Sequence, residues 1–204
     1  MLFSDTYLTI ASPAEGIYKD RGSKFLAFAF PVKREEEVKE QLGKLQKEHP
    51  GANHHCYAFR VGADKTLFRA NDDGEPSGTG GKPILGQIQS KDLTNILIVV
   101  VRYFGGSLLG VPGLIAAYKG AAADALANST IIEKQIMEIY QLYFPYAAMN
   151  DVMKILKEED LTQWDQDFQL HCKLKFSVRK NDADKVIVKF TSIADVNTDY
   201  LQTV

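Results

Sequence analysis

The sequence has few cysteines, no long apolar run and no excess of either charge. It contains two cysteines, Cys56 and Cys172, which lie 116 positions apart. A disulfide framework or a zinc site with Cys-x-x-Cys spacing needs more cysteines at closer spacing, so neither is expected. Such sparse use of cysteine is typical of a reducing compartment, and we expect a cytoplasmic protein.

The chain also lacks the segments that direct a protein into a membrane. Its longest apolar run, residues 96–101, has six residues. A membrane-spanning helix needs about 20. The first five residues contain no basic region ahead of an apolar one, so we expect no signal peptide and no membrane partner.

Charge gives no preference for a class of partner. The 204 residues include 24 Lys and Arg against 26 Asp and Glu, which leaves a net charge of −2. That balance produces no overall attraction to nucleic acid, so any such contact requires a local patch. With 45% hydrophobic residues, the composition is typical of a folded globular protein.

Periodicity indicates mixed α and β structure in the first part of the chain. Phe and Ala alternate over residues 24–30, which is typical of a strand, and Val38, Leu42 and Leu45 have helical spacing. The apolar run within 94–104 predicts a central strand that is buried on both faces. The predicted elements are strands at 24–30, 54–61, 66–70 and 94–104 and helices at 34–48 and 112–128.

The second part of the chain predicts a separate domain. Strands near 132–143, 161–166, 168–178 and 196–203 and helices near 145–159 and 182–194 follow in the order β-α-β-β-α-β. That order is the one of the ferredoxin-like fold. A boundary near Asn128–Thr130 divides the chain into residues 1–131, with net charge +1, and 132–204, with net charge −3. The predicted fold class is therefore α+β with two domains.

A long Gly-rich loop, residues 71–83, separates two apolar strands. It contains Asp72, Asp73, Glu75 and Lys82 among four glycines and two prolines. Its spacing fits neither a Walker motif nor a dinucleotide fingerprint, and the adjacent aspartates do not fit a calcium loop. It is either a stiff surface loop or a binding loop, and ordered loops of this length are often functional.

A second Gly-rich loop, residues 102–113, joins the central strand to a helix N-terminus. Free backbone N–H groups at such a position favour an anion. Arg102 and Tyr103 offer charge and a stacking face, although a plain connection is the alternative. Because both loops follow central strands of one sheet, we expect them to lie close together.

The neighbouring residues His54, His55 and Cys56 are candidates for metal binding or nucleophilic catalysis. Adjacent strand residues point to opposite faces, so His54 and Cys56 share one face and His55 lies on the other. A single histidine with Asp72, Asp73 or Glu75 remains the one metal arrangement available. We expect neither a metal, a cofactor nor a catalytic residue.

These motifs together resemble the IMPACT/YigZ family. Residues 54–60, 72–83 and 99–110 match that family's pattern in order, spacing and identity. The resemblance implies a first domain with the α/β sandwich fold of domain IV of elongation factor G and of a ribosomal protein domain. It also implies a ferredoxin-like second domain, similar to the last domain of the same factor. Eukaryotic relatives with a different extra domain regulate translation, and nucleic-acid binding and a proline-peptide hydrolase activity have been suggested for the bacterial branch.

The leading functional interpretation is a non-enzymatic, translation-linked regulator that contacts RNA or the ribosome. The alternatives are a metal-assisted, peptidase-like hydrolase and a regulator that binds a protein partner through the same surface. No sequence feature fixes an oligomeric state. The candidate binding surface comprises His54, His55, Asp72, Asp73, Glu75, Gly78, Thr79, Gly81, Lys82, Arg102, Tyr103, Gly105 and Gly106.

Overall fold

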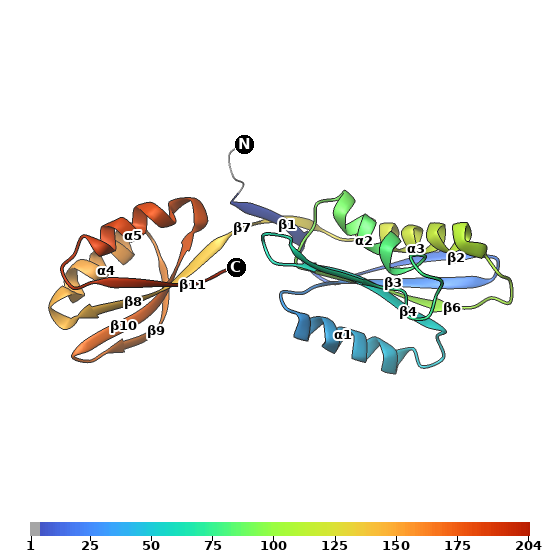
Figure 1. Ribbon diagram of the computed structural model, residues 1–204, viewed down its shortest axis with the longest axis horizontal. Coiled ribbons are helices and arrows are strands. Elements are labelled where there is room, and N and C mark those ends of the chain that lie inside the picture. The colour runs from blue at the N-terminus through green and yellow to red at the C-terminus, as the bar shows by residue number, and fades with distance from the viewer. Residues whose placement is uncertain (1–4) are drawn as a thin grey trace. The chain divides into compact units, whose positions relative to one another are not determined.

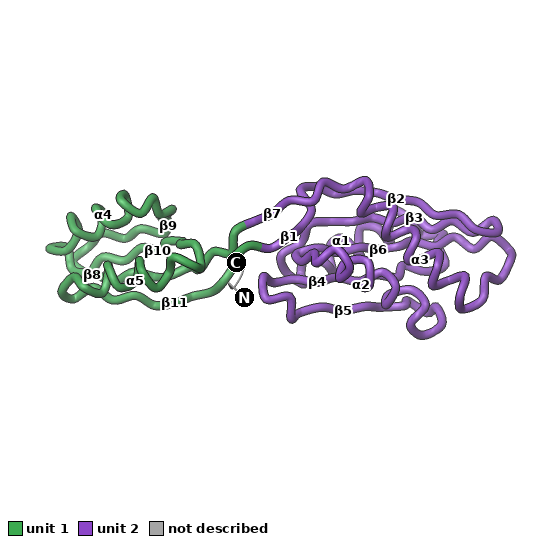
Figure 2. Tube along the Cα trace, turned by 90° about the horizontal axis from the view of Figure 1, so that it is seen from above, with its two compact units in different colours: residues 1–6, 135–204 green, residues 7–134 purple. Residues whose placement is uncertain are grey.

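The computed structural model describes residues 5–204, which form two compact units (Figure 2). The first unit comprises residues 7–134, and the second comprises residues 5–6 and 135–204. The division therefore falls three residues after the boundary that the sequence indicates, and the start of the described chain belongs to the second unit. The expectation of no signal peptide concerns mainly residues 1–4, which lie outside the described residues.

The first unit is built on a five-stranded antiparallel sheet. Its central strand is β6 (Ile96–Tyr103), which pairs with β3 on one side and β4 on the other. Residues 96–102 of β6 are buried, as the apolar run predicts. The strand order is β2 (Ala14–Asp20), β3 (Ser23–Pro31), β6, β4 (His54–Val61) and β5 (Leu67–Asn71).

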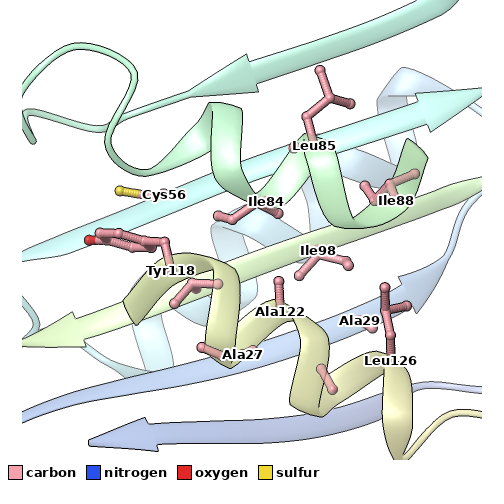
Figure 3. Close-up of a cluster of buried hydrophobic side chains, with 14 of the residues drawn as sticks. Ala27, Ala29, Cys56, Ile84, Leu85, Ile88, Ile98, Tyr118, Ala122 and Leu126 are labelled. Atoms are coloured by element: carbon pink, nitrogen blue, oxygen red, sulfur yellow. The ribbon is translucent and has the colours of Figure 1, made fainter. Parts of the chain in front are cut away.

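Helices cover both faces of this sheet (Figure 1). Helix α1 (Glu35–Glu48) packs on one face, where Val38 and Leu45 meet Val99 and Val101. Helices α2 (Gly81–Ser90) and α3 (Gly110–Ala127) cover the other face. The sheet contributes small side chains there, among them Ala27 and Ala29, so the Ala-rich helix α3 approaches closely (Figure 3).

Three elements of this unit are absent from the sequence prediction. They are β1 (Thr6–Ile10), β2 and α2. Strand β1 pairs with β7 (Ile131–Gln135) in a separate two-stranded sheet. The expected loop through Pro83 is wrong at its end, because Gly81–Pro83 form the first turn of α2. Two glycines and a proline give this segment a weak helical pattern. Proline is nevertheless tolerated in a first turn, because an N–H group there would have no acceptor within the helix.

The second unit confirms the predicted order of elements. A four-stranded antiparallel sheet has the order β11-β8-β10-β9, and Leu142, Leu174 and Phe176 pack beneath the helices. The expected strand at 132–143 is two strands, β7 and β8, interrupted at Ile136. The elements are β8 (Met137–Pro145), α4 (Met149–Glu158), β9 (Thr162–Phe168), β10 (His171–Arg179), α5 (Ala183–Thr191) and β11 (Asn197–Thr203), with short 3-10 turns at Tyr146–Ala148 and Lys180–Asp182.

Within residues 5–204, none of the helices combines the length and the apolar character needed to cross a membrane.

We predict that the two units fold independently, because each has its own buried cluster. Fragments 7–134 and 135–204, expressed separately, should each show a cooperative thermal transition by circular dichroism. The shorter fragment should be the less stable, since small domains bury a smaller share of their surface. Fragments that remain unfolded alone but fold on mixing would contradict this prediction.

Candidate functional site

The two Gly-rich loops lie together at one edge of the first sheet, as the sequence predicts. The end of β5, the end of β6 and the beginning of β4 meet there, since Asn71 pairs with Tyr57 and Arg102 with His54. The loops line a pocket of about 460 Å³. Its floor contains His54, Glu75 and Arg102, and its other lining residues are Asn53, Pro76, Phe104, Leu108, Leu109, Gly110, Val111 and Leu114.

A buried ion pair joins the first loop to the central strand. Nη1 of Arg102 donates to Oε1 of Glu75 at 2.5 Å, and the two side chains are 7% and 3% exposed. The hydroxyl of Tyr118 on α3 donates to the same oxygen at 2.7 Å. The rings of Phe25 and Phe104 lie 5.5 and 5.6 Å from the Arg102 guanidinium, within cation–π range. One carboxylate thus connects the loop, a strand and a helix.

His54 lies beside this pair and is oriented by the loop. Its Nδ1 is 2.7 Å from the carbonyl oxygen of Asp73, and a carbonyl only accepts, so Nδ1 carries the proton. Its Nε2 lies 3.9 Å from Oε2 of Glu75. In the neutral ring Nε2 is an acceptor at the pocket floor.

His55 and Tyr103 lie on the opposite face of the sheet from the pocket. Tyr103 contacts His49 of α1 through its hydroxyl, 2.9 Å from Nδ1. Burial lowers the pKa of His55, and its Nε2 is buried without a hydrogen-bond partner among the described residues. The expectation that Arg102 and Tyr103 serve one surface is therefore wrong, because consecutive strand residues point to opposite faces.

Asp72 builds the first loop from within. Its Oδ1 accepts the N–H groups of Gly80 and Gly81 at 2.9 and 2.8 Å, and its Oδ2 accepts that of Gly78 at 2.8 Å. Burial alone would raise the pKa of Asp72, but these three donors together hold it below its usual range. The carboxylate thereby satisfies N–H groups at the start of α2, which has no side-chain cap from its own N-cap residue.

Other residues of the predicted surface also support the loop. Asp73 accepts the backbone N–H of His55 at 2.6 Å, and Thr79 donates to the carbonyl of Pro76 at 2.6 Å. At Gly81 an added Cβ would lie 2.4 Å from the backbone nitrogen of Asn71, so only glycine fits. Asp73, Thr79 and Gly81 do not line the pocket, and neither does the exposed Lys82.

The glycines of the second loop serve close packing and chain reversal. A Cβ at Gly105 would lie 2.0 Å from the carbonyl carbon of Gly22, and Gly106 has a φ of +87°. Neither lines the pocket. They let the chain turn from β6 toward α3, which places Leu108 and Leu109 over the floor.

Cys56 faces the core and is chemically quiet. Burial raises the pKa of its thiol to about 12, and its sulfur donates to the carbonyl of Asp72 at 3.0 Å. Within residues 5–204, no three His, Cys, Asp or Glu side chains are grouped as metal ligands. The carboxylates of Asp72 and Asp73 are instead directed at backbone N–H groups.

Tyr118 and the apolar wall of the pocket are absent from the sequence prediction. Tyr118 is fully buried and lies beside Cys56 at one end of the core (Figure 3). A single tyrosine in an Ala-rich helix and two consecutive leucines in a Gly-rich loop were the available signals. Leu108 is 82% exposed and Val111 51%, which leaves the rim of the pocket unusually apolar.

Comparisons with known proteins match both units. The family model described as the Impact N-terminal domain matches residues 21–126. The IMPACT family member YigZ of Escherichia coli is 32% identical over 200 residues, covering 97% of each chain. YvyE of Bacillus subtilis, in the same family, is 34% identical and covers 75% of this chain and 70% of its own.

Solved structures give a matching fold. A crystal structure of a hypothetical protein covers 98% of this chain and 99% of its own, with a TM-score of 0.78 and 29% identity. The two-domain translational regulator Yih1 covers 60% of this chain and 47% of its own, with 29% identity and a TM-score of 0.35. The first of these supports the two-unit α+β fold.

We predict that Asp72→Asn lowers the free energy of unfolding at pH 7 by about 1–3 kcal/mol, because an amide cannot accept all three N–H groups. The native pKa of Asp72 is depressed, so its contribution is present above the unfolded pKa and is lost as the pH falls through the native pKa. Urea unfolding at pH 7 and at about pH 3 should show the wild-type advantage shrinking at the lower pH. Glu36→Gln, at an exposed carboxylate, is the control and should change little.

We predict that Arg102→Met destabilises the protein by about 3–5 kcal/mol, because it leaves Glu75 buried without its cation. Adding Glu75→Gln should restore part of that loss, since the amide still accepts from Tyr118. Denaturant unfolding in a double-mutant cycle measures this coupling. The exposed pair Lys44 and Glu40 is the control, with an expected coupling of about 1 kcal/mol or less. Similar coupling in both pairs would contradict a structural role for Glu75.

Proposed function

The chain belongs to the IMPACT family, and we propose that it is a translation-linked regulator that acts by binding a protein partner through the pocket of its first unit. The translation link is suggested by the family resemblance and by the description of Yih1 as a translational regulator. The nature of the partner is argued from the pocket.

One observation carries the choice of a protein partner. The pocket combines a neutralised floor with an apolar, exposed rim, on which Phe104, Leu108 and Val111 are 45%, 82% and 51% exposed. Single exposed apolar side chains are common on protein surfaces, but apolar side chains that gather at one pocket with polar surroundings mark an interaction site. A buried hydrophobic centre is what protein interfaces share.

The same geometry gives less support to RNA. A nucleic-acid site uses cations that are free to neutralise phosphates. Arg102 is 93% buried as a side chain and already donates to Glu75, and Lys82 does not line the pocket. RNA or ribosome contact through the Gly-rich loops is therefore the alternative, and the experiment described below distinguishes it from a protein partner.

Hydrolysis also receives less support than binding. A hydrolase needs an activated nucleophile or water beside groups that stabilise developing charge. Asp72 and Asp73 are directed at backbone N–H groups, and the thiol of Cys56 is buried with a raised pKa. His54 remains as a polar group that faces the pocket, where it is placed to orient a ligand.

The proposal predicts that Leu108→Asp abolishes partner capture while leaving the fold intact. Affinity-tagged wild-type and variant proteins are incubated with cell extract, and bound components of the translation machinery are identified by mass spectrometry. Leu108 becomes buried when the partner binds, and loss of one such leucine weakens binding about ten- to a hundredfold. Leu170→Asp is the matched control, because Leu170 is 80% exposed in the second unit.

The captured protein is then purified, and its affinity for the wild-type protein and for the Leu108→Asp and Leu170→Asp variants is measured directly. If the partner is a protein, its capture should survive ribonuclease treatment, and its binding should weaken little between low and high salt. Capture that disappears with ribonuclease and falls steeply with salt would favour RNA instead. Equal binding by the Leu108 and Leu170 variants would overturn the proposed surface.

A further inference from the structure

Arg102 has more hydrogen-bond donors than the protein uses. A guanidinium presents five N–H donors on three nitrogens. Within residues 5–204, Nη1 alone of these nitrogens has an acceptor, and Nε is buried without one. The side chain is 7% exposed and forms part of the pocket floor. A buried polar group without a partner needs an explanation, and the guanidinium keeps N–H groups that no acceptor within the described residues uses.

Helix α3 presents further donors at the same pocket. It begins at Gly110, and no side chain caps its N-terminus. Gly110 and Val111 both line the pocket. The first N–H groups of a helix lack intrahelical acceptors, and the helix dipole makes this end favourable for negative charge. Arg102 and the first residues of α3 therefore line the same pocket.

The rest of the pocket selects an apolar group. Leu108, Leu109 and Leu114 surround the floor, and the volume of about 460 Å³ is within the range of ligand pockets. A phosphate carries no apolar surface of its own and would leave these leucines uncovered. A carboxylate attached to an apolar side chain satisfies the donors and covers the wall together.

We propose that this pocket binds the free C-terminal carboxylate of a polypeptide whose last side chain is apolar. The inference rests on the proposed function and names the part of the partner that enters the pocket. The carboxylate lies at Arg102 and the α3 N-terminus, and the last side chain lies against Leu109 and Leu114. Capture of chain termini by backbone N–H groups is a known mode of peptide recognition.

The exposed rim points to a polypeptide rather than a free fatty acid. Leu108, Val111 and Phe104 extend the apolar surface beyond the pocket, where residues that precede the terminus would cover them. A single acyl chain inside the pocket would leave that rim in water. Glu75 already balances the charge of Arg102, so the hydrogen-bond donors and the helix dipole provide the selectivity for the acid.

The test compares two ligands on the same folded protein. Short fluorescent peptides of glycine and serine that end in leucine are prepared with a free carboxylate and with a C-terminal amide. Fluorescence polarisation on the full chain should give about tenfold or more tighter binding for the acid, as expected for charge-assisted hydrogen bonds. Because the difference lies in the ligand, no variant needs to fold for the result to count.

Variants then locate the site. Leu108→Asp should weaken binding of the acid about tenfold or more, whereas Leu170→Asp should leave it unchanged. Arg102→Lys keeps the positive charge but loses the planar fork, so the acid should lose its advantage over the amide. Its fold is checked by circular dichroism.

The outcomes separate this inference from the proposed function. If the acid and the amide bind equally and binding still depends on Leu108, the proposed recognition of the carboxylate is wrong. The proposed protein-binding surface would then still be supported. Decanoate serves as a free fatty acid in the same assay. If it binds more tightly than the peptide acid, the proposal that the carboxylate comes from a polypeptide is wrong. Absence of binding by either peptide would also overturn the inference, whereas partner capture unaffected by Leu108→Asp would overturn the proposed function itself.

Discussion

The site of the first unit depends on one buried ion pair, Glu75 with Arg102. Burying a charge is unfavourable unless it is paired and hydrogen-bonded, and here Tyr118 provides the additional donor. Because the three residues come from a loop, a strand and a helix, their contact fixes those elements relative to one another. The pocket forms because Glu75 anchors the loop of residues 71–83 to Arg102, and the loop of residues 102–113 lines the other side.

Most of the polar residues in the Gly-rich segment build the loop and do not face a ligand. Asp72 gathers three N–H groups, and Asp73 takes one from β4. The glycines permit backbone approaches that no side chain would allow, as at Gly81 against Asn71. A dense cluster of acids and glycines is therefore compatible with a site whose ligand-facing surface is largely apolar.

The two units differ in what they contribute to the candidate site. The pocket and the Impact N-terminal domain match both lie within residues 7–134. The second unit has a separate core around Phe176 and Phe190, beneath the helices α4 and α5. The match to the relative from Escherichia coli extends over both units.

Features that repeat locally could be predicted from the amino-acid pattern. Alternation and helical spacing predicted the buried strand β6, the opposite faces of His54 and His55, and the element order of the second unit, because those patterns depend on backbone geometry alone. Contacts between residues far apart in the sequence depend on the folded chain and could not be predicted in this way. Glu75 meets Arg102, 27 positions away, only through the sheet and the fold of the intervening loop. Helix α2 has a Gly- and Pro-containing sequence with weak intrinsic helical preference, and its N-terminal N–H groups find their acceptor in Asp72. The apolar rim likewise depends on where α3 begins, since Leu108 becomes part of a pocket only when the two loops lie side by side.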